Sequence, residues 1–251
     1  VAVVVPARCR SLSEKAMLKR LLAALRAQTH PSAIVLVDDG SDPPIAEQHV
    51  EIIRIPRRLG PAAARNRGCE RALALGVDVV AFTDVDCVPA PDWVERLVGA
   101  LRDTSAHAVG GTTRAFDRAA LARYHERNGT LNGRELAHRP GELLYAPTCN
   151  LAVHAEVFRE LRFDQAFATA AAEDIDLCLR AARAGFRIRH APGAIVRHDF
   201  GYDGRHPLAQ LRRFWSQFRR SAEGERRLTA RHPQYARSFA STREISCASA
   251  P

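Results

Sequence analysis

The sequence lacks the features that identify several large classes of protein. It has no apolar run of the about 20 residues that a membrane-spanning helix needs. Its first residues, VAVVVPAR, lack the basic leader and the cleavage site of a secretory signal. The six cysteines include no CxxC pair, which disfavours a zinc site, and their scatter is typical of buried thiols in a reducing cytoplasm. We therefore expect a cytoplasmic protein, with contact at the inner face of the membrane as an open alternative.

Lysine and aromatic residues are also scarce. Lys15 and Lys19 are the only lysines among the 37 basic residues, a bias typical of a GC-rich genome. The net charge of +9 favours an anionic partner: a phosphorylated ligand, a nucleic acid or an acidic membrane. Nucleic-acid binding requires a basic stripe interleaved with stacking aromatics. Aromatics make up 6% of the chain, and only residues 206–227 offer such a stripe, so we expect no nucleic-acid partner.

Short apolar strands alternate with helical patterns through the first part of the chain. The predicted strands cover residues 1–5, 33–37, 51–55 and 77–83. Helical periodicity over 13–28 and 60–76 separates them, and Ser13 is the expected N-cap of the first helix. Neither a GxGxxG nor a Walker lysine motif is present. The repetition of strand, helix and strand predicts a parallel, doubly wound sheet.

In such a sheet, ligands gather at the carboxyl ends of the strands. Small and polar residues follow three of the predicted strands: Pro6-Ala7-Arg8, Asp38-Asp39 and Asp84-Val85-Asp86. Period-two alternation places Asp84 and Asp86 on the same side of an extended segment, where two carboxylates repel each other unless a cation joins them. A hard divalent ion such as Mg²⁺ or Mn²⁺ suits these oxygen ligands. For this pair alone, a polar loop that caps the next helix stays open as the alternative.

A second acidic cluster lies in the C-terminal half. Glu173, Asp174 and Asp176 open a strong helical pattern, and His198 leaves a predicted strand, AIVR, further along the chain. Acidic residues in a first turn are ordinary partners of the helix dipole, which explains any one of them. The helix dipole does not explain as well why a second whole cluster of acidic residues stands before an amphipathic helix. The two clusters together favour a functional site.

Seven stretches carry a family resemblance, from Val1 to about Gly201. They are VVVPAR, VLVDDGSDP, RRLGPAAARNRG, AFTDVDCVPAPDWVERL, APTCNLAVHAEVF, FDQAFATAAAEDIDLCLRAARAGFRI and VRHDFG. In this order and spacing, the set resembles the family-2, inverting glycosyltransferases with the GT-A fold. The resemblance implies an α/β, Rossmann-like GT-A fold, with a mostly parallel central sheet flanked by helices and a C-terminal helical extension.

The resemblance also implies an organisation of the chain. Residues 1–111 form the half that binds the nucleotide sugar, and residues 112–205 form the acceptor-binding and catalytic half of the same domain. Residues 206–251 form a basic helical extension whose tail, STREISCASAP, is expected to be disordered. The stretch 134–145 matches no family motif, and we expect it to form acceptor-side surface.

The family gives a role to each candidate residue. For the nucleotide sugar, the resemblance implies contacts from Pro6, Ala7, Arg8, Asp38, Asp39, Arg65, Asp84 and Val85. Asp86 and His198 match the metal ligands. Asp174 matches the catalytic base, and Glu173 then orients the acceptor or the base. One departure is ATAAAEDIDL, which has alanines where relatives often carry glycine or an aromatic, and this could reshape the acceptor subsite.

The implied chemistry explains these residue types. Mn²⁺ or Mg²⁺, with nearby arginines, neutralises the diphosphate of a nucleotide-diphosphate sugar, UDP being the default nucleotide of the family. A carboxylate removes the proton of the acceptor hydroxyl as it attacks the anomeric carbon from the opposite face, which inverts the configuration. The acceptor stays open among a lipid carrier, a polysaccharide, a peptide and a small metabolite. A retaining mechanism has no positive support in the sequence.

Two other functions stay open at this point. A GT-A protein without transfer activity would bind nucleotide and metal but turn over no donor, which the presence of Asp86, Asp174 and His198 disfavours. A sugar-phosphate nucleotidyltransferase requires a glycine-rich first loop, and PARCRSLSEK has no glycine.

The C-terminal stretch 206–227 has apolar residues at helical spacing with arginines between them. Such a helix packs its apolar face on the core or lies on an anionic membrane as a peripheral contact, and both interpretations stay open.

Overall fold

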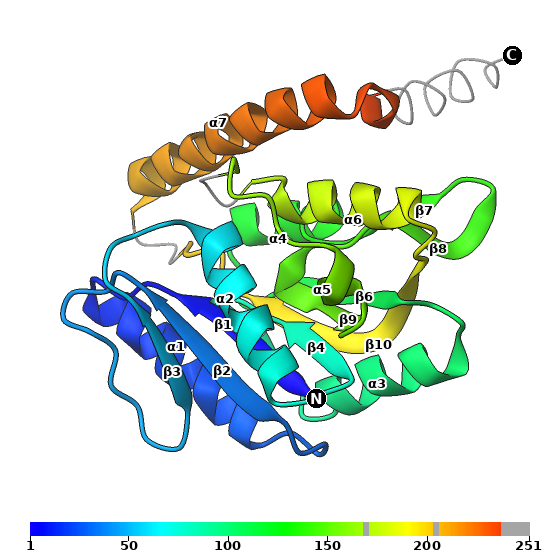
Figure 1. The fold of residues 1–251 in the computed structure, drawn as a ribbon. Coiled ribbons are helices and arrows are strands. Elements are labelled where there is room, and N and C mark those ends of the chain that lie inside the picture. The colour runs from blue at the N-terminus through cyan, green and yellow to red at the C-terminus, as the bar shows by residue number, and fades with distance from the viewer. Residues whose placement is uncertain (168–170, 203–205, 237–251) are drawn as a thin grey trace, which may run out of the picture.

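The computed structural model describes residues 1–167, 171–202 and 206–236, in which one twisted sheet runs through the molecule (Figure 1). In sheet order its strands are β3 (Glu51–Ile55), β2 (Ala33–Asp39), β1 (Ala2–Ala7), β4 (Val79–Phe82), β9 (Leu151–His154), β6 (Ala108–Ala115), β10 (Ile188–His198), β8 (Arg139–Tyr145) and β7 (Arg134–Leu136). The short strand β5 (Cys87–Pro89) pairs with the end of β10.

The N-terminal part of the sheet is parallel, as predicted. β1 pairs in parallel with β2 and β4, and β2 pairs in parallel with β3. β9 then runs antiparallel between β4 and β6, so the sheet is mixed from there on. In β1, Val3 and Val5 face one core while Ala2 and Val4 face the other. Burial on both faces explains the continuous apolar run of this strand.

Helices cover both faces of the sheet (Figure 1). The helices are α1 (Leu12–Arg26), α2 (Pro61–Ala74), α3 (Trp93–Asp103), α4 (Ala120–Arg127), α5 (Val157–Glu160), α6 (Glu173–Arg183) and α7 (Pro207–Arg231), with a 3-10 turn η1 (Thr148–Asn150). α1 and α3 pack on one face, and α2, α5 and α6 pack on the other. A Cβ atom at Gly68 of α2 would lie 2.2 Å from Val4, so this glycine lets α2 approach β1 closely. The five described cysteines are buried free thiols, as expected.

The first helix begins earlier than predicted. Ser11, not Ser13, is its N-cap: the Ser11 hydroxyl accepts from the Glu14 amide, and the Glu14 carboxylate accepts from the Ser11 amide at 2.9 Å. The prediction was wrong because Ser11, and not Ser13, stands three residues before a glutamate, which is the spacing of a capping box.

The two predicted halves share this sheet. The boundary at 111/112 falls inside β6, whose whole length pairs with β10. The unassigned stretch 134–145 forms the β7–β8 hairpin, which joins the sheet through the pairing of Glu142 with Arg189. The division of labour between the halves, and an acceptor-side role for the hairpin, stay predictions.

Helix α7 crosses one edge of the molecule, over α4 and α6 (Figure 1). Phe214 packs with the cluster around Phe200 and Tyr202, and Leu228 packs with Leu179 of α6. Of the two interpretations of this helix, these contacts support packing of one face on the core. No helix in the described ranges is long and apolar enough to cross a bilayer. The tail predicted to be disordered lies outside the described residues.

Candidate active site

The first acidic motif lies in a turn. The Cys87 amide donates to the Asp84 carbonyl at 3.0 Å, which closes a turn between β4 and β5. The expectation of an extended segment with both carboxylates on one side was wrong, because the chain reverses here to pair β5 with β10. As a result the two carboxylates contact different partners: Asp84 contacts Arg65, and Asp86 contacts His198.

Strand pairing brings Asp86 to His198. β5 runs antiparallel to the end of β10, with Cys87 opposite His198, and the Asp199 amide donates to the Asp86 carbonyl at 2.7 Å. The Asp86 Oδ1 atom then lies 3.3 Å from His198 Nε2. The Cys87 thiol donates to the same carboxylate at 3.9 Å. The three possible ligand atoms lie within 4.8 Å of one another, close enough for one ion to touch them.

These residues fit a divalent cation. The Asp86 side chain is 35% exposed, so an ion can reach it. Burial and the negative charge of Asp84 raise the pKa of Asp86, against the opposing effect of His198, so a cation here would relieve an unfavourable charge. Burial also raises the pKa of Cys87, which keeps it a neutral thiol and a poor ligand for Mn²⁺ or Mg²⁺. The buried His198 Nδ1 has no partner among the described residues.

Arg65 of α2 joins the two acidic clusters. Its guanidinium is buried, and it donates to Glu173 at 2.6 Å and to Asp84 at 2.8 Å. Burial alone would lower the pKa of Arg65, but the charges of Asp84, Glu173 and Asp174 outweigh burial and raise it. The sequence placed Arg65 at the nucleotide, which stays a prediction. Through these two contacts, the Arg65 side chain lies between the turn after β4 and the start of α6.

The two acids that open α6 differ in environment. Glu173 is 3% exposed and bonded to Arg65, whereas Asp174 is partly exposed. Burial, and then Asp174, raise the pKa of Glu173 to about 7. Burial also raises the pKa of Asp174, although Arg65 and the amides of Thr148 and Ile175 act in the opposite direction. An accessible carboxylate with a raised pKa can accept a proton from an incoming hydroxyl.

The residue before this pair adopts a strained backbone. Ala172 has a φ of 70°, in the left-handed region that glycine adopts easily. An alanine in this conformation therefore costs about 1 kcal/mol relative to a glycine.

The other predicted nucleotide contacts lie at the same edge of the sheet. Asp38 is fully buried and accepts from Ser41, Ile45 and Arg54, and these bonds lower its pKa although burial alone would raise it. The Asp39 carboxylate accepts from the amides of residues 59 and 60, just before α2. Asp38 therefore holds the loop after β2, and a contact of Asp39 with the base stays a prediction.

The loop after β1 offers a free cation. β1 runs two residues further than predicted, so Pro6 and Ala7 belong to the strand, where they pair with β2, and only Arg8 lies in the loop. Pro6 and Arg8 are partly exposed and Ala7 is buried. The buried Arg8 Nε atom has no hydrogen-bond partner, and Arg8 forms no ion pair within the part of the chain that the structure describes. Val85, between the two aspartates of the turn, packs against the core. Arg8 is thus available to an anionic ligand.

Sequence reasoning missed a buried contact behind the site. Asp176 is fully buried and accepts from Arg180 and from His232, whose Nε2 lies 2.8 Å from it. Glu173, Asp176 and Arg180 share one face of α6 at spacings of three and four, which the helical period could have indicated. His232 lies 56 residues from Asp176 and gave no local signal. The contact ties the end of α7 to the helix that carries Asp174.

Replacement of His232 by alanine is expected to destabilise the protein by about 2 kcal/mol, because a buried carboxylate loses a partner. The melting temperature should fall by about 4–8 °C. His138→Ala, at an exposed histidine, serves as the matched control and should not change it. Equal melting temperatures for wild type and His232→Ala would show that this contact does not hold α7.

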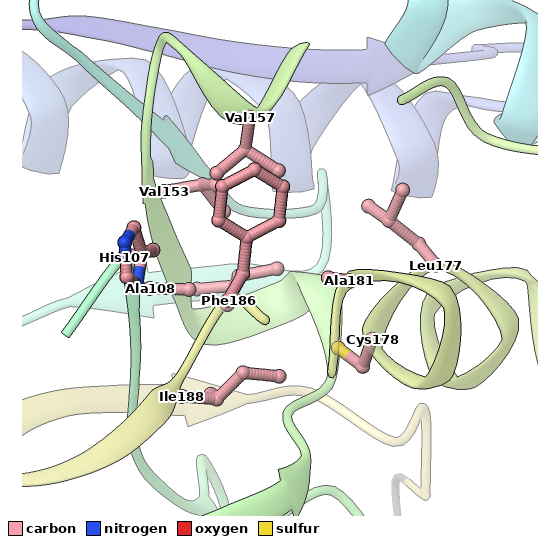
Figure 2. A pocket seen from close by; sticks show the side chains of 10 residues that line it. His107, Ala108, Val153, Val157, Leu177, Cys178, Ala181, Phe186 and Ile188 are labelled. Atoms are coloured by element: carbon pink, nitrogen blue, oxygen red, sulfur yellow. The ribbon is translucent and has the colours of Figure 1, made fainter. Parts of the chain in front are cut away.

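A small hollow lies away from these residues. Figure 2 shows its lining, in which Leu177, Cys178 and Ala181 of α6 face side chains from β9, β10 and the segments beside them. Its volume is about 20 Å³ and its lining is apolar. The hollow is therefore a packing gap in the core beneath α6, too small for a nucleotide.

Comparison with known proteins identifies the family of the chain. Residues 2–162 match the family described as Glycosyl transferase family 2. A pre-mycofactocin glycosyltransferase of Mycobacterium tuberculosis is 32% identical over 215 residues, which cover 79% of this chain and 42% of the relative. An undecaprenyl-phosphate 4-deoxy-4-formamido-L-arabinose transferase of Pectobacterium atrosepticum is 32% identical over 133 residues, 49% of this chain and 39% of the relative. The chain thus spans about two fifths of the length of these relatives.

Solved structures share the fold. The crystal structure of GalNAc-T7 with UDP, GalNAc and Mn²⁺ superposes with a TM-score of 0.59 at 18% identity, covering 79% of this chain and 43% of that one. That of S. aureus TarS 1–349 with UDP gives 0.55 at 15% identity, covering 78% and 58%. The mixed α/β architecture is therefore that of the GT-A proteins. By the match over residues 2–162, the chain belongs to glycosyl transferase family 2, a family of glycosyltransferase enzymes.

Proposed function

We propose that this chain is a metal-dependent, inverting glycosyltransferase that moves a sugar from a nucleotide-diphosphate sugar to an acceptor hydroxyl. The observation that carries the proposal is the double contact of Arg65 with Asp84 and Glu173. One buried side chain thereby brings the turn that carries Asp86 next to the helix that carries Asp174. A donor site and a catalytic base must be neighbours in a single-displacement transfer.

Each residue then has a task. Asp174 accepts the proton of the acceptor hydroxyl as that oxygen attacks the anomeric carbon from the face opposite the leaving diphosphate. Glu173, held by Arg65, fixes the start of α6 and so the position of Asp174. Arg8, whose buried Nε has no hydrogen-bond partner among the described residues, is proposed to bind a phosphate group of the donor. A divalent ion at Asp86 and His198 would neutralise charge on the leaving diphosphate.

The donor is proposed to be UDP-linked. Two structural neighbours were crystallised with UDP, and one of them also with Mn²⁺, which supports this nucleotide and a divalent ion. For the acceptor, the comparisons offer only the names of the relatives. The names of the relatives point to a pre-mycofactocin and to undecaprenyl phosphate as acceptors of those proteins.

Binding of UDP is expected to require the metal. UDP with Mn²⁺ should raise the melting temperature by about 5–10 °C at about 100 times the dissociation constant, since a ligand stabilises the folded state by mass action. UDP with a chelator should give a much smaller shift, because the diphosphate would then face Asp84 and Asp86 without a cation. Asp86→Asn should reduce the shift with Mn²⁺, whereas Asp103→Asn, at an exposed position at the end of α3, should not.

Equal shifts with Mn²⁺ and with chelator would contradict the metal site. The two other functions give different products. A GT-A protein without transfer activity would show the shift and release no UDP from any UDP-sugar in the presence of acceptors. A nucleotidyltransferase would release pyrophosphate from a nucleoside triphosphate and a sugar phosphate.

A further inference from the structure

One side of α7 remains exposed although the helix is packed. Leu208, Leu211 and Trp215 are 79%, 46% and 65% exposed. Their spacing of three and four residues places them in one stripe along the helix. Phe214 and Leu228, by contrast, belong to buried clusters on the inner side. The apolar stripe is thus additional to the face that holds α7 on the protein, and packing on the core does not explain it.

The same side is strongly basic. Residues 207–222 contain the arginines 212, 213, 219 and 220 and no acidic residue. Arg212 follows Leu208 by one turn and Arg219 follows Trp215 by one turn, so both lie beside the stripe. Within the described part of the chain, neither forms an ion pair, whereas the ion pairs of α7 involve Arg227 and Arg231 in its last turns. The first four turns therefore present an apolar stripe with unpaired positive charge.

We infer that the outward side of the first half of α7 docks on an anionic lipid bilayer. The leucines and Trp215 would enter the boundary between headgroups and acyl chains, where tryptophan is favoured. Arg212 and Arg219 would meet the negatively charged headgroups. A second copy of the chain fits less well, because a two-fold contact of this face with itself would bring the arginines of both copies together.

Docking would bring the proposed active site to the membrane. On its inner side α7 lies next to residues of the proposed site: Phe214 packs with the cluster that contains Phe200, two residues after His198, and His232, the C-cap of α7, bonds to Asp176 of α6. If the proposed function holds, the acceptor is then a lipid-linked molecule displayed at the bilayer surface. The docking itself does not depend on the proposed function.

Vesicle binding without donor or acceptor tests the inference. The full chain should sediment with vesicles of phosphatidylcholine mixed with phosphatidylglycerol, and not with vesicles of phosphatidylcholine alone. High salt should weaken binding, because it screens the arginines. Of the two tryptophans, Trp93 is fully buried and Trp215 is exposed, so a blue shift of tryptophan fluorescence on binding would report Trp215.

Matched variants locate the surface. The combined change Leu208→Ser, Leu211→Ser and Trp215→Ser should lower the partition coefficient at least tenfold, and Arg212→Gln with Arg219→Gln should lower it for anionic vesicles. Leu75→Ser, at an exposed leucine where α2 ends before β4, should leave it unchanged. All three positions of the serine variant are exposed, so its UDP-dependent melting shift should equal that of the wild type.

Three results would overturn the inference: no sedimentation of the wild type with anionic vesicles, equal binding by the serine variant, or equal binding to neutral vesicles. A wild type that forms dimers and binds no vesicles, with a monomeric serine variant, would also overturn it and assign the stripe to self-association. None of these results bears on sugar transfer in solution, and a failure to transfer sugar leaves the vesicle result intact.

Discussion

Asp174→Asn is expected to lower the kcat of sugar transfer about a thousandfold, within the range of general-base contributions. An amide keeps the shape of the side chain and its contact with the Thr148 amide, but it cannot accept the proton of the acceptor hydroxyl. Donor binding should survive, because the proposed nucleotide and metal contacts involve other residues. The variant should therefore keep the full melting shift with UDP and Mn²⁺.

The measurement is the release of UDP from a UDP-sugar with and without acceptor, at saturating donor. Asp78→Asn, at an exposed position before β4, is the control and should keep the wild-type rate. Loss of the UDP-dependent shift in Asp174→Asn would mean that Asp174 serves the donor. An unchanged rate would mean that the base lies elsewhere.

The pH dependence of the wild type follows from the same assignment. Burial raises the pKa of Asp174 above that of a free aspartate, and that of Glu173 to about 7. A base must be ionised, so activity should be lost as the pH falls through these raised values. The acidic limb belongs to the interacting pair, not to one carboxyl group. In Glu173→Gln the limb should move to lower pH, because the member of the pair with the higher pKa is then removed.

The sequence predicted the N-terminal half of the fold well for a physical reason. Strands β1, β2 and β4 are buried on both faces, which requires uninterrupted apolar runs that stand out in the sequence. The position of β9 was not predictable in the same way. Its insertion between β4 and β6 depends on pairing between segments far apart in the chain, which no local pattern encodes.

In the candidate site, too, residues with a local sequence signal were predicted and contacts between distant segments were not. The acids were found because carboxylates at strand ends and helix starts are local features. Their partners were not: the turn that separates Asp84 from Asp86, and the bond from His232 to Asp176, arise from tertiary packing. Arg65 was placed near the nucleotide by resemblance, but its role as a link between clusters required the fold.

Arg65→Met is expected to abolish transfer and to destabilise the protein by about 3–5 kcal/mol at about pH 8, the usual cost of removing one partner of a buried ion pair. The cost arises mainly at Glu173, whose side chain is 4% exposed, since the Asp84 side chain is 28% exposed and can be hydrated. Lysine should not restore the wild type, because one ammonium cannot reproduce the two-sided contact of the guanidinium. Arg67→Met is the control, because Arg67 lies two residues further along α2 and its side chain is exposed.

The destabilisation should depend on pH in a direction that the structure fixes. In the wild type the pKa of Glu173 is raised to about 7 from its ordinary value near 4.5, and loss of Arg65 would raise it further. A carboxyl group with a raised pKa destabilises the fold as the pH rises above its unfolded value, because the folded state then releases its proton at a cost. At about pH 5 the group is protonated in the folded state of both proteins, so Arg65→Met should cost little more than the lost contact with Asp84.

At about pH 8 the wild type keeps an ion pair where the variant holds a carboxyl group that resists ionisation, so the difference in unfolding free energy should be largest there. Adding Glu173→Gln to Arg65→Met should remove most of the pH dependence and recover part of the stability, since no buried charge is then left uncompensated. Transfer activity should not return in the double variant, because the start of α6 would still lack its tie to the turn after β4. The test is urea unfolding of the wild type, Arg65→Met, the double variant and the control Arg67→Met at both pH values. A cost of Arg65→Met that is equal at both pH values would contradict the pairing of this arginine with an ionised Glu173.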